Sequence, residues 1–394
     1  MDTRTGLPVV GMIGGGQLAR MTHQAAIALG QSLRVLANDV DESAALVAAD
    51  VQLGSHTDLD ALRTFAKSCD VVTFDHEHVP GEHIRALVAA GHKVFPGADA
   101  LQYAQDKHLM RRKLSELGAP VPRWAPIASA AELVEFGLPA VVKTARGGYD
   151  GRGVFVVNDV EEIIDLLASG AELIVEEKVE LRRELAVQVA RSPYGQVAVY
   201  PVVETVQRDG ICVEVLAPAP DLPEDVAVGA QELAIRLANE LGVVGLLAVE
   251  LFEVAGGGPR TGGQSETPSG LVVNELAMRP HNSGHWTIEG ARTSQFEQHL
   301  RAVLDYPMGD TSLAAPVVVM ANVLGGPDGG LSIDERLHHL MAAEPGVKVH
   351  LYGKQTRPGR KIGHVTALGD DLADCRARAA RAGHWLTYGK ALEA

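Results

Sequence analysis

The chain has 394 residues, enough for two or three domains with their own hydrophobic cores, and its 46% apolar and 22% charged residues are ordinary for a globular protein. The formal net charge of −15 at pH 7 argues against a nucleic-acid-binding surface, because affinity for a phosphate backbone requires clustered excess cations. The sequence shows no signal-peptide pattern and no apolar run long enough to span a membrane, and three scattered cysteines without a CxxC pair predict a reducing cytoplasm and no zinc site.

The N-terminal region matches a dinucleotide-binding fingerprint. A predicted strand at 8–13 leads into Gly14-Gly15-Gly16-Gln17-Leu18-Ala19 and a predicted helix at 17–29, and Asp39 follows the next strand at 33–37. Glycines in the turn and an acid about twenty residues later are typical of a Rossmann βαβ unit. Because any phosphate is stabilised at a helix N-terminus, the pattern predicts a Rossmann-like half-domain with an anion site, without choosing a cofactor.

Strands and helices continue to alternate, which predicts a parallel sheet. Further strands are expected at 51–53, 70–74 and 93–95, with helices beginning at Asp58 and Gly81. Asp75 and Glu77 follow the strand at 70–74, where open α/β sheets bind ligands, although a solvated charged turn is the alternative. One long helix is expected at 100–117, with Lys107 and Arg111 on one face.

A glycine-rich loop marks the middle of the chain. After a linker at 120–126, helices are expected at 130–136 and 160–167 and a strand at 173–176. Between them, Lys143 precedes 147–153, where four of seven residues are glycine. Such a backbone can fold over a ligand with its N–H groups inward, and lysine and arginine would oppose the charge of a polyphosphate. An ordinary hairpin turn is the alternative.

The third region carries a pair of acids on apolar strands. Strands are expected at 184–190, 196–203, 211–217 and 243–252, with a helix at 223–240. Residues 271–276 pair naturally with 246–254 as an antiparallel hairpin, which would bring Glu250 and Glu275 together. The Gly/Ser/Pro-rich loop at 255–270 between them is expected to be disordered. Two carboxylates beside Asn274 would suit Mg²⁺ that bridges substrate phosphates, whereas the alternative places one acid at a strand end.

Two polar segments follow. His281 and His285 have a spacing that suggests metal ligands, but Pro280 and Gly284 disfavour a helix and no third ligand is evident. A loop of donors, Arg279, His281 and Asn282, that holds a small oxyanion is the preferred interpretation. Five cations without an acid at 354–364 then predict a phosphate site, with a solvated basic turn as the alternative.

Taken in order, these segments resemble one family. GGGQLARM (14–21), GGYDGRG (147–153), NELAMRPHNSGHWT (274–287) and RPGRKIGH (357–364) are similar to the N5-carboxyaminoimidazole ribonucleotide synthases of the ATP-grasp superfamily, and the resemblance runs end to end. Biotin carboxylases and glycinamide ribonucleotide formyltransferases share the architecture, but the Tyr-Asp in the glycine loop and the Arg-Pro-His-Asn run look like the synthases.

The resemblance implies a fold and a reaction. It implies an α/β and α+β ATP-grasp protein with a Rossmann-like pre-ATP-grasp domain (1–120), a central lid domain (121–180) and a C-terminal ATP-grasp domain with a small subdomain (181–394). It implies a cytoplasmic homodimer in which ATP, bicarbonate and 5-aminoimidazole ribonucleotide give the N5-carboxylated ribonucleotide, ADP and phosphate through carboxyphosphate. Mg²⁺ would be the metal cofactor, and no nucleic acid or membrane would be a partner.

The resemblance also implies residue roles. Contact with the ATP phosphates would fall to Lys107, Lys143, Gly148, Tyr149, Asp150, Gly151, Arg152, Gly153 and Val154. Adenine and ribose would be held by Glu176, Glu177, Val179 and Glu184, with Lys178 and Gln207 also at the nucleotide. Mg²⁺ would be bound by Glu250 and Glu275 beside Asn274, and bicarbonate by Arg279, His281 and Asn282. The ribonucleotide would meet Tyr149, Asp150, Arg152, Gln17, Glu77, Lys354, Arg360 and Lys361, with Asp150 as a base or orienting group.

The sequence departs from the family pattern at three places. Lys107 stands where relatives usually carry arginine, Gln207 where a histidine is common, and the loop at 255–270 looks longer than usual. Two other functions compete with the synthase. A nicotinamide dehydrogenase would rest on 14–39 alone, and hydride transfer does not need the Glu250/Glu275 pair. A nucleotide sensor without catalysis is disfavoured by the intact set of carboxylates and cations.

Overall fold

The computed structural model describes residues 1–148, 152–255, 270–327 and 329–392. Its N-terminal sheet is parallel, as predicted, with the order β3-β2-β1-β4. The strands are β1 (Val9–Ile13), β2 (Ser32–Ala37), β3 (Asp50–Leu53) and β4 (Val71–Phe74), and the helices between them are α1 (Gln17–Ala28), α2 (Leu59–Ala66) and, after β4, α3 (Gly81–Ala89). The predicted strand at 93–95 is reduced to a single parallel bridge between Val72 and Val94.

The single helix predicted at 100–117 is wrong. Two helices, α4 (Ala98–Gln105) and α5 (Lys107–Glu116), meet at Asp106, whose backbone is extended with φ −138° and ψ 109°. The Asp106 side chain accepts a hydrogen bond of 3.0 Å from the main-chain N–H of Leu109, so it caps the second helix instead of continuing the first. The break turns Lys107 and Arg111 inward, and both are buried.

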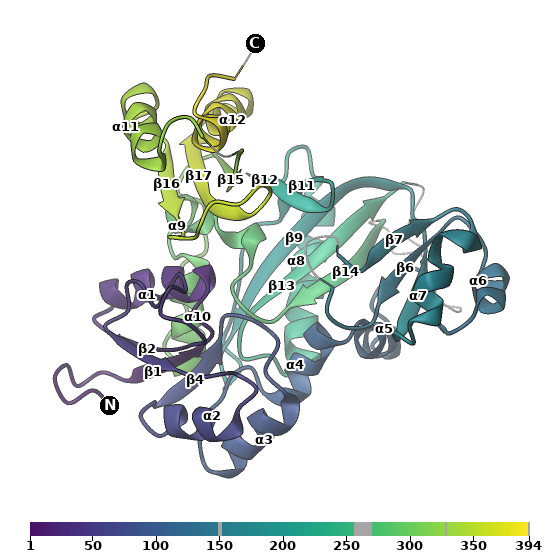
Figure 1. The fold of residues 1–394 in the computed structure, drawn as a ribbon, viewed down its shortest axis with the longest axis horizontal. Coiled ribbons are helices and arrows are strands. Elements are labelled where there is room, and N and C mark those ends of the chain that lie inside the picture. The colour runs from purple at the N-terminus through teal and green to yellow at the C-terminus, as the bar shows by residue number, and fades with distance from the viewer. Residues whose placement is uncertain (149–151, 256–269, 328, 393–394) are drawn as a thin grey trace.

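The middle of the chain forms a small antiparallel sheet with the order β5-β8-β6-β7, at the right of Figure 1. Its strands are β5 (Trp124–Ile127), β6 (Ala140–Thr144), β7 (Val154–Val157) and β8 (Leu173–Glu177). Helix α6 (Ala130–Phe136) begins as predicted, with a capping box between Ser129 and Glu132. The predicted helix at 160–167 is a 3₁₀ turn, Val160–Ile163, followed by the short α7 (Ile164–Ala168).

A nine-stranded antiparallel sheet occupies the rest of the chain, with the path β14-β13-β9-β11-β12-β15-β17-β16 and β10 paired to β9. The strands are β9 (Leu181–Arg191), β10 (Val197–Val199), β11 (Val203–Arg208), β12 (Ile211–Ala217), β13 (Gly245–Val254), β14 (Leu271–Ala277), β15 (Val317–Leu324), β16 (Lys348–Leu351) and β17 (Lys361–Gly369). The strand predicted at 196–203 is instead split into two, because Pro201 has no N–H to continue a ladder. The helices are α8 (Glu224–Glu240), α9 (Thr287–Gly290), α10 (Gln295–Leu304), α11 (Ile333–Ala343) and α12 (Leu372–Tyr388).

The predicted hairpin of acids is confirmed. Strands β13 and β14 are antiparallel neighbours, and Glu250 lies directly opposite Glu275 in their register. A β-bulge follows Glu250 on this ladder, so the pairing shifts by one residue beyond it.

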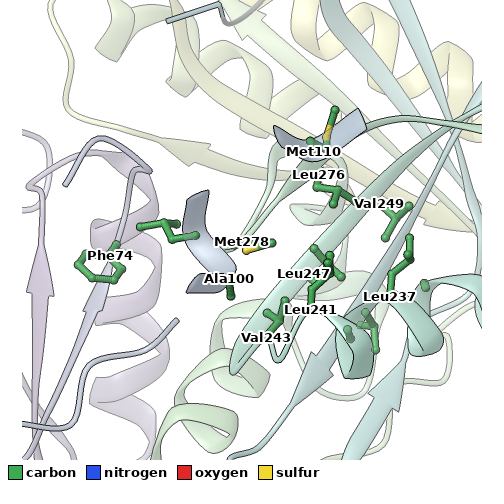
Figure 2. Packing of buried hydrophobic residues seen from close by; sticks show 14 of the residues in the cluster. Phe74, Ala100, Met110, Leu237, Leu241, Val243, Leu247, Val249, Leu276 and Met278 are labelled. Carbon is green, nitrogen blue, oxygen red and sulfur yellow. The ribbon is translucent and has the colours of Figure 1, made fainter. Parts of the chain in front are cut away.

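One hydrophobic core joins the N-terminal region to the large sheet. Figure 2 shows Phe74 and Ala100 of the N-terminal region in the same cluster as Leu247, Leu276 and Met278 of the large sheet. The middle sheet has a separate core around Leu133 and Val142. The N-terminal sheet and the large sheet are therefore fixed relative to each other by a shared hydrophobic core. The middle sheet is stabilised by its own separate core. Within the described residues, no helix has the length and apolar character needed to cross a membrane.

Each of the three sheets takes its strands from one of the three predicted domain ranges, 1–120, 121–180 and 181–394. We keep those boundaries as a proposal. The α/β and α+β fold class is confirmed by the parallel N-terminal sheet and the two antiparallel sheets.

Candidate active site

A cavity of about 1800 Å³ lies where the three sheets and the segment before β17 meet. The predicted site residues that line it are Gln17, Glu77, Lys107, Lys143, Gly148, Val154, Glu176, Glu177, Lys178, Val179, Glu184, Gln207, Glu250, Asn274, Glu275, Arg279, His281, Asn282, Lys354, Arg360 and Lys361. Of the predicted site residues that the structure describes, Arg152 and Gly153 are not among the lining residues. Tyr149, Asp150 and Gly151 lie outside the described residues.

The glycine turn before α1 does not provide a free anion site, so that prediction is wrong. The main-chain N–H of Gly15 donates to Oε2 of Glu42 over 3.0 Å, and the carboxylate of Asp75 lies against Gly14 and Gly16. A Cβ on Gly14 would overlap Oδ1 of Asp75, so the glycine is needed for the carboxylate to approach. The protein's own acids fill the place where a dinucleotide pyrophosphate would bind, which removes the main support for a dehydrogenase.

Asp75 is therefore a buried acid packed against the glycine turn. Burial raises its pKa to about 6, against the opposing effect of the Gly16 N–H and the nearby Arg279 guanidinium. Glu77, two residues on, is also engaged by the protein: its carboxylate accepts from the N–H of Met278 at 3.0 Å and from Nε of Arg279 at 3.1 Å. Neither acid is part of a solvated turn: Glu77 fixes the start of the loop after β14, and Asp75 lies against the glycine turn.

A buried ion cluster ties α5 to the middle sheet and to β14. Arg111, which is fully buried, donates from Nε to Oε1 of Glu176 at 2.6 Å, and Nζ of Lys143 lies 2.7 Å from Oε2 of the same carboxylate. Arg111 also donates to the carbonyl oxygens of Val273 and Asn274, and Lys143 donates to Oδ1 of Asn274. Burial alone would raise the pKa of Glu176, but Arg111 and Lys143 outweigh it and lower the pKa to about 2. Burial lowers the pKa of Lys143, partly offset by Glu176.

The Glu250/Glu275 pair is shared unequally among nearby cations. Nζ of Lys107 lies 2.6 Å from Oε1 of Glu275, whereas Oε1 of Glu250 lies 3.5 Å from Nε2 of His281, and Lys361 and Arg279 lower the Glu250 pKa through their charge. Burial, then the charges of Glu275 and Glu184, raise the pKa of Glu250 to about 8. An added cation would relieve this repulsion, and two carboxylates with the Asn274 amide oxygen form a suitable oxygen donor set for Mg²⁺. In the described part of the chain, no group of three or more His, Cys, Asp or Glu side chains could hold a metal, so substrate phosphate oxygens and water would supply the remaining ligands of a bound Mg²⁺.

The loop after β14 carries several polar side chains that line the cavity. The Ser283 N–H donates to Nδ1 of His281 at 3.3 Å, so the hydrogen of a neutral His281 is on Nε2, which faces Glu250. Burial, with Arg279 and Lys361 nearby, holds the pKa of His281 well below its usual value. Both amide atoms of Asn282 are buried without a hydrogen-bond partner among the described residues, close to the thiol of Cys212, a weak partner. Arg279, His281 and Asn282 thus present donors to the cavity.

The basic segment is tied to the N-terminal region at its start, whereas its residues 355–360 are exposed. Nζ of Lys354 donates to Oε1 of Gln17, and Oγ of Ser43 donates to the carbonyl oxygen of Tyr352 at 2.5 Å. Nη1 of Arg360 donates to the carbonyl oxygen of Gln355 at 3.4 Å. Lys354, Arg360 and Lys361 line the same cavity as Lys143 and Glu176 of the middle sheet.

Sequence reasoning missed several residues at this site. The sequence placed Arg111 on the same helix face as Lys107 but gave it no role, because most pairs of charged residues on a helix face are exposed to solvent. Arg146 also lines the cavity and pairs with Asp106 at 2.8 Å; its place just before the glycine loop was the available signal. Cys212 and Arg357 line the cavity as well. Of the two residues that depart from the family pattern, Lys107 pairs with Glu275, and Gln207 lies near Glu184 and opposes the rise in pKa that burial causes in that carboxyl.

We predict that Glu176→Gln lowers the free energy of unfolding by about 3 kcal/mol, because it leaves Arg111 and Lys143 as uncompensated buried cations. Urea unfolding of the purified protein would measure the loss. Glu116→Gln on the same helix α5 is the control, since that side chain is exposed and its ion pair with Arg112 is 3.9 Å long; it should change stability by less than about 0.5 kcal/mol. Equal unfolding midpoints for the two variants would contradict the cluster's structural role.

Comparisons with known proteins agree along the whole chain. Family models match a ribonucleotide synthetase preATP-grasp domain at 7–105, an ATP-grasp domain at 112–296 and a phosphoribosylaminoimidazole carboxylase C-terminal domain at 318–378. The N5-carboxyaminoimidazole ribonucleotide synthase of Mycobacterium bovis is 59% identical over 97% of this chain and 89% of its own length.

Solved structures give the same result. An N5-carboxyaminoimidazole ribonucleotide synthetase in complex with ADP has a TM-score of 0.86 and 34% identity, covering 97% of this chain and 98% of that one. The Aspergillus clavatus synthase in complex with ADP and 5-aminoimidazole ribonucleotide has a TM-score of 0.83 and 30% identity, covering 96% and 98%. The chain therefore belongs to the N5-carboxyaminoimidazole ribonucleotide synthase family, ATP-binding ligases with the ATP-grasp fold.

Proposed function

We propose that the chain carboxylates the amine of 5-aminoimidazole ribonucleotide with bicarbonate and ATP, as a step of purine biosynthesis. One observation carries the proposal: a single cavity joins the Glu250/Glu275 pair, the donor loop that begins at Arg279, and the cations of the basic segment. These three sets correspond to a metal-bound triphosphate, a small oxyanion and a ribonucleotide phosphate. The family membership and the relative solved with ADP and the ribonucleotide support the same reaction.

The first chemical step would be phosphoryl transfer. A bicarbonate oxygen attacks the γ-phosphorus of ATP, the bond to the β-phosphate oxygen breaks, and ADP leaves, which gives carboxyphosphate. Such transfers depend on positioning and on stabilisation of charge. Lys107 and Lys143 lie beside the acid pair and would approach the phosphates. Mg²⁺ held by Glu250, Glu275 and the Asn274 amide oxygen would supply positive charge between phosphate oxygens.

The donor loop would hold the bicarbonate. Arg279 offers guanidinium N–H groups, neutral His281 offers Nε2–H, and Asn282 offers an amide that lacks a partner within the described residues. Donors fixed before the reaction stabilise developing negative charge without reorganising. The acid Glu250 would require a cation nearby before an anion could bind next to it.

The second step would join the substrates. The amine nitrogen attacks the carboxyl carbon of carboxyphosphate, phosphate leaves, and the nitrogen loses a proton. Lys354, Arg360, Lys361 and Gln17 would bind the phosphate of the ribonucleotide. Gly148 and Val154 line the cavity on either side of Tyr149, Asp150 and Gly151, which stay predicted lid residues, with Asp150 as the predicted base or orienting group. Closure of this lid would keep water from the carboxyphosphate.

The remaining assignments follow from the family resemblance. We propose that Glu177, Lys178, Val179 and Glu184, which line the cavity along β8 and the start of β9, contact the adenosine part of ATP. A homodimer and a cytoplasmic location are part of the same proposal.

Release of ADP from the purified enzyme tests the substrate assignment. We expect ADP formation to require bicarbonate and to be accelerated strongly by 5-aminoimidazole ribonucleotide, because carboxyphosphate is productive only when the amine is bound. A coupled assay for ADP would be run with each substrate omitted in turn. ADP formation that is indifferent to the ribonucleotide would overturn the assignment.

Arg360→Ala should raise KM for the ribonucleotide about tenfold or more while kcat changes less, because it removes a cation from the predicted phosphate site. Steady-state kinetics with each substrate varied would separate the effects. Arg292→Ala removes an exposed arginine that does not line the cavity, and it should leave all KM values within about twofold. A selective loss of ATP affinity in Arg360→Ala would place this arginine elsewhere.

A further inference from the structure

We infer that Gln295, the first residue of α10, is a positioning residue for the oxyanion-binding loop. The inference rests on the proposed function, because it concerns the loop that would hold bicarbonate. Gln295 is fully buried and does not line the cavity, so it would act through the residues that it holds.

The Gln295 carboxamide clamps both main-chain polar groups of His281. Its Oε1 accepts from the His281 N–H at 2.9 Å, and its Nε2 donates to the His281 carbonyl oxygen at 2.8 Å. A main-chain N–H only donates and a carbonyl oxygen only accepts, so the orientation of the amide is fixed without ambiguity. The peptide groups on both sides of the His281 Cα are thereby held to a helix start instead of to the loop itself.

The same amide fixes the hydrogen of a second histidine. With its orientation set by His281, the remaining hydrogen of Gln295 Nε2 points to Nδ1 of His285, 3.0 Å away. Nδ1 must accept, and neutral His285 therefore carries its hydrogen on Nε2. Burial, with His364 and His281 nearby, holds the pKa of His285 well below its usual value, so it stays neutral beneath the donor loop.

The surrounding residues are arranged to admit this amide. Oγ1 of Thr287 accepts from the main-chain N–H of Gln295 at 2.8 Å and donates to the carbonyl oxygen of Gly284 at 2.6 Å. A Cβ on Gly284 would overlap Oε1 of Gln295, so the loop has room for the amide only with glycine there. The loop between β14 and α9 is thus built around one side chain of α10.

Three residues later the same helix provides a matched control. Gln298 is also fully buried, and it clamps a single residue in the same way: Nε2 donates to the Gly309 carbonyl oxygen at 2.9 Å and Oε1 accepts from the Gly309 N–H at 2.8 Å. Neither Gln298 nor Gly309 lines the cavity. Gln295→Met and Gln298→Met therefore remove equivalent buried clamps, and only one of them acts on the proposed bicarbonate site.

The experiment measures steady-state kinetics with bicarbonate varied in carbon-dioxide-depleted buffer for wild type, Gln295→Met, Gln298→Met and His281→Ala. We expect Gln295→Met to lower kcat/KM for bicarbonate about 10- to 100-fold, with KM for ATP and the ribonucleotide within about twofold, because a small displacement of donors weakens catalysis strongly. Gln298→Met should keep all kinetic constants within about twofold. Identical bicarbonate kinetics in the two methionine variants would overturn the inference.

A double mutant separates this inference from the proposed function. If Gln295 acts through His281, adding Gln295→Met to His281→Ala should lower kcat/KM less than about threefold further, whereas full multiplication of the two effects would contradict the inference. An unchanged bicarbonate dependence in His281→Ala would instead overturn the proposed bicarbonate site itself. Should Gln295→Met not fold, Gly284→Ala displaces the amide without removing it and should give the same selective loss; wild-type bicarbonate kinetics in that variant would count against the inference.

Discussion

Two carboxylates that face each other across a β-ladder set the electrostatics of this protein. Glu250 and Glu275 are register partners on β13 and β14, and burial together with mutual repulsion raises the pKa of Glu250. Two lysines lie beside this pair. Lys107 forms an ion pair with Glu275, and Lys143 donates a hydrogen bond to the side chain of Asn274, the residue before Glu275. Under the proposed function, the pair would attract a divalent cation together with its phosphates, and that added charge would favour the binding of a second anion.

The other buried charges fix the walls of the same cavity, and each joins segments far apart in the chain. Arg111 on α5 meets Glu176 on β8 and the carbonyl oxygens of β14, so the middle sheet is anchored at one end by an ion cluster. Glu77, after β4, holds Arg279 after β14. Gln295 on α10 forms hydrogen bonds to both main-chain polar groups of His281. A chain with a net charge of −15 thus gathers its cations where substrates with phosphate and carboxylate groups would bind.

Sequence patterns within short segments predicted the features that are determined by residues close together in the chain. The apolar strands around Glu250 and Glu275 predicted their pairing, because only a hairpin would bury both strands, and the alternation before residue 97 predicted the parallel sheet. Tertiary contacts decided the rest. Asp106 broke a continuous helical pattern by capping α5, and the glycine turn was filled by Glu42 and Asp75, which no spacing rule connects to it. No sequence pattern pointed to Gln295, because its role depends on hydrogen bonds between its side-chain amide and the main-chain N–H and carbonyl groups of His281.

We propose the acid pair as the site where a divalent cation joins the nucleotide, and calorimetric titration of ADP with and without Mg²⁺ tests this most directly. In the wild type, Mg²⁺ should tighten ADP binding. Glu275→Gln should lose most of that gain and, with it, turnover, whereas Glu240→Gln, an exposed acid at the end of α8, should behave as the wild type. An undiminished effect of Mg²⁺ in Glu275→Gln would contradict the central claim.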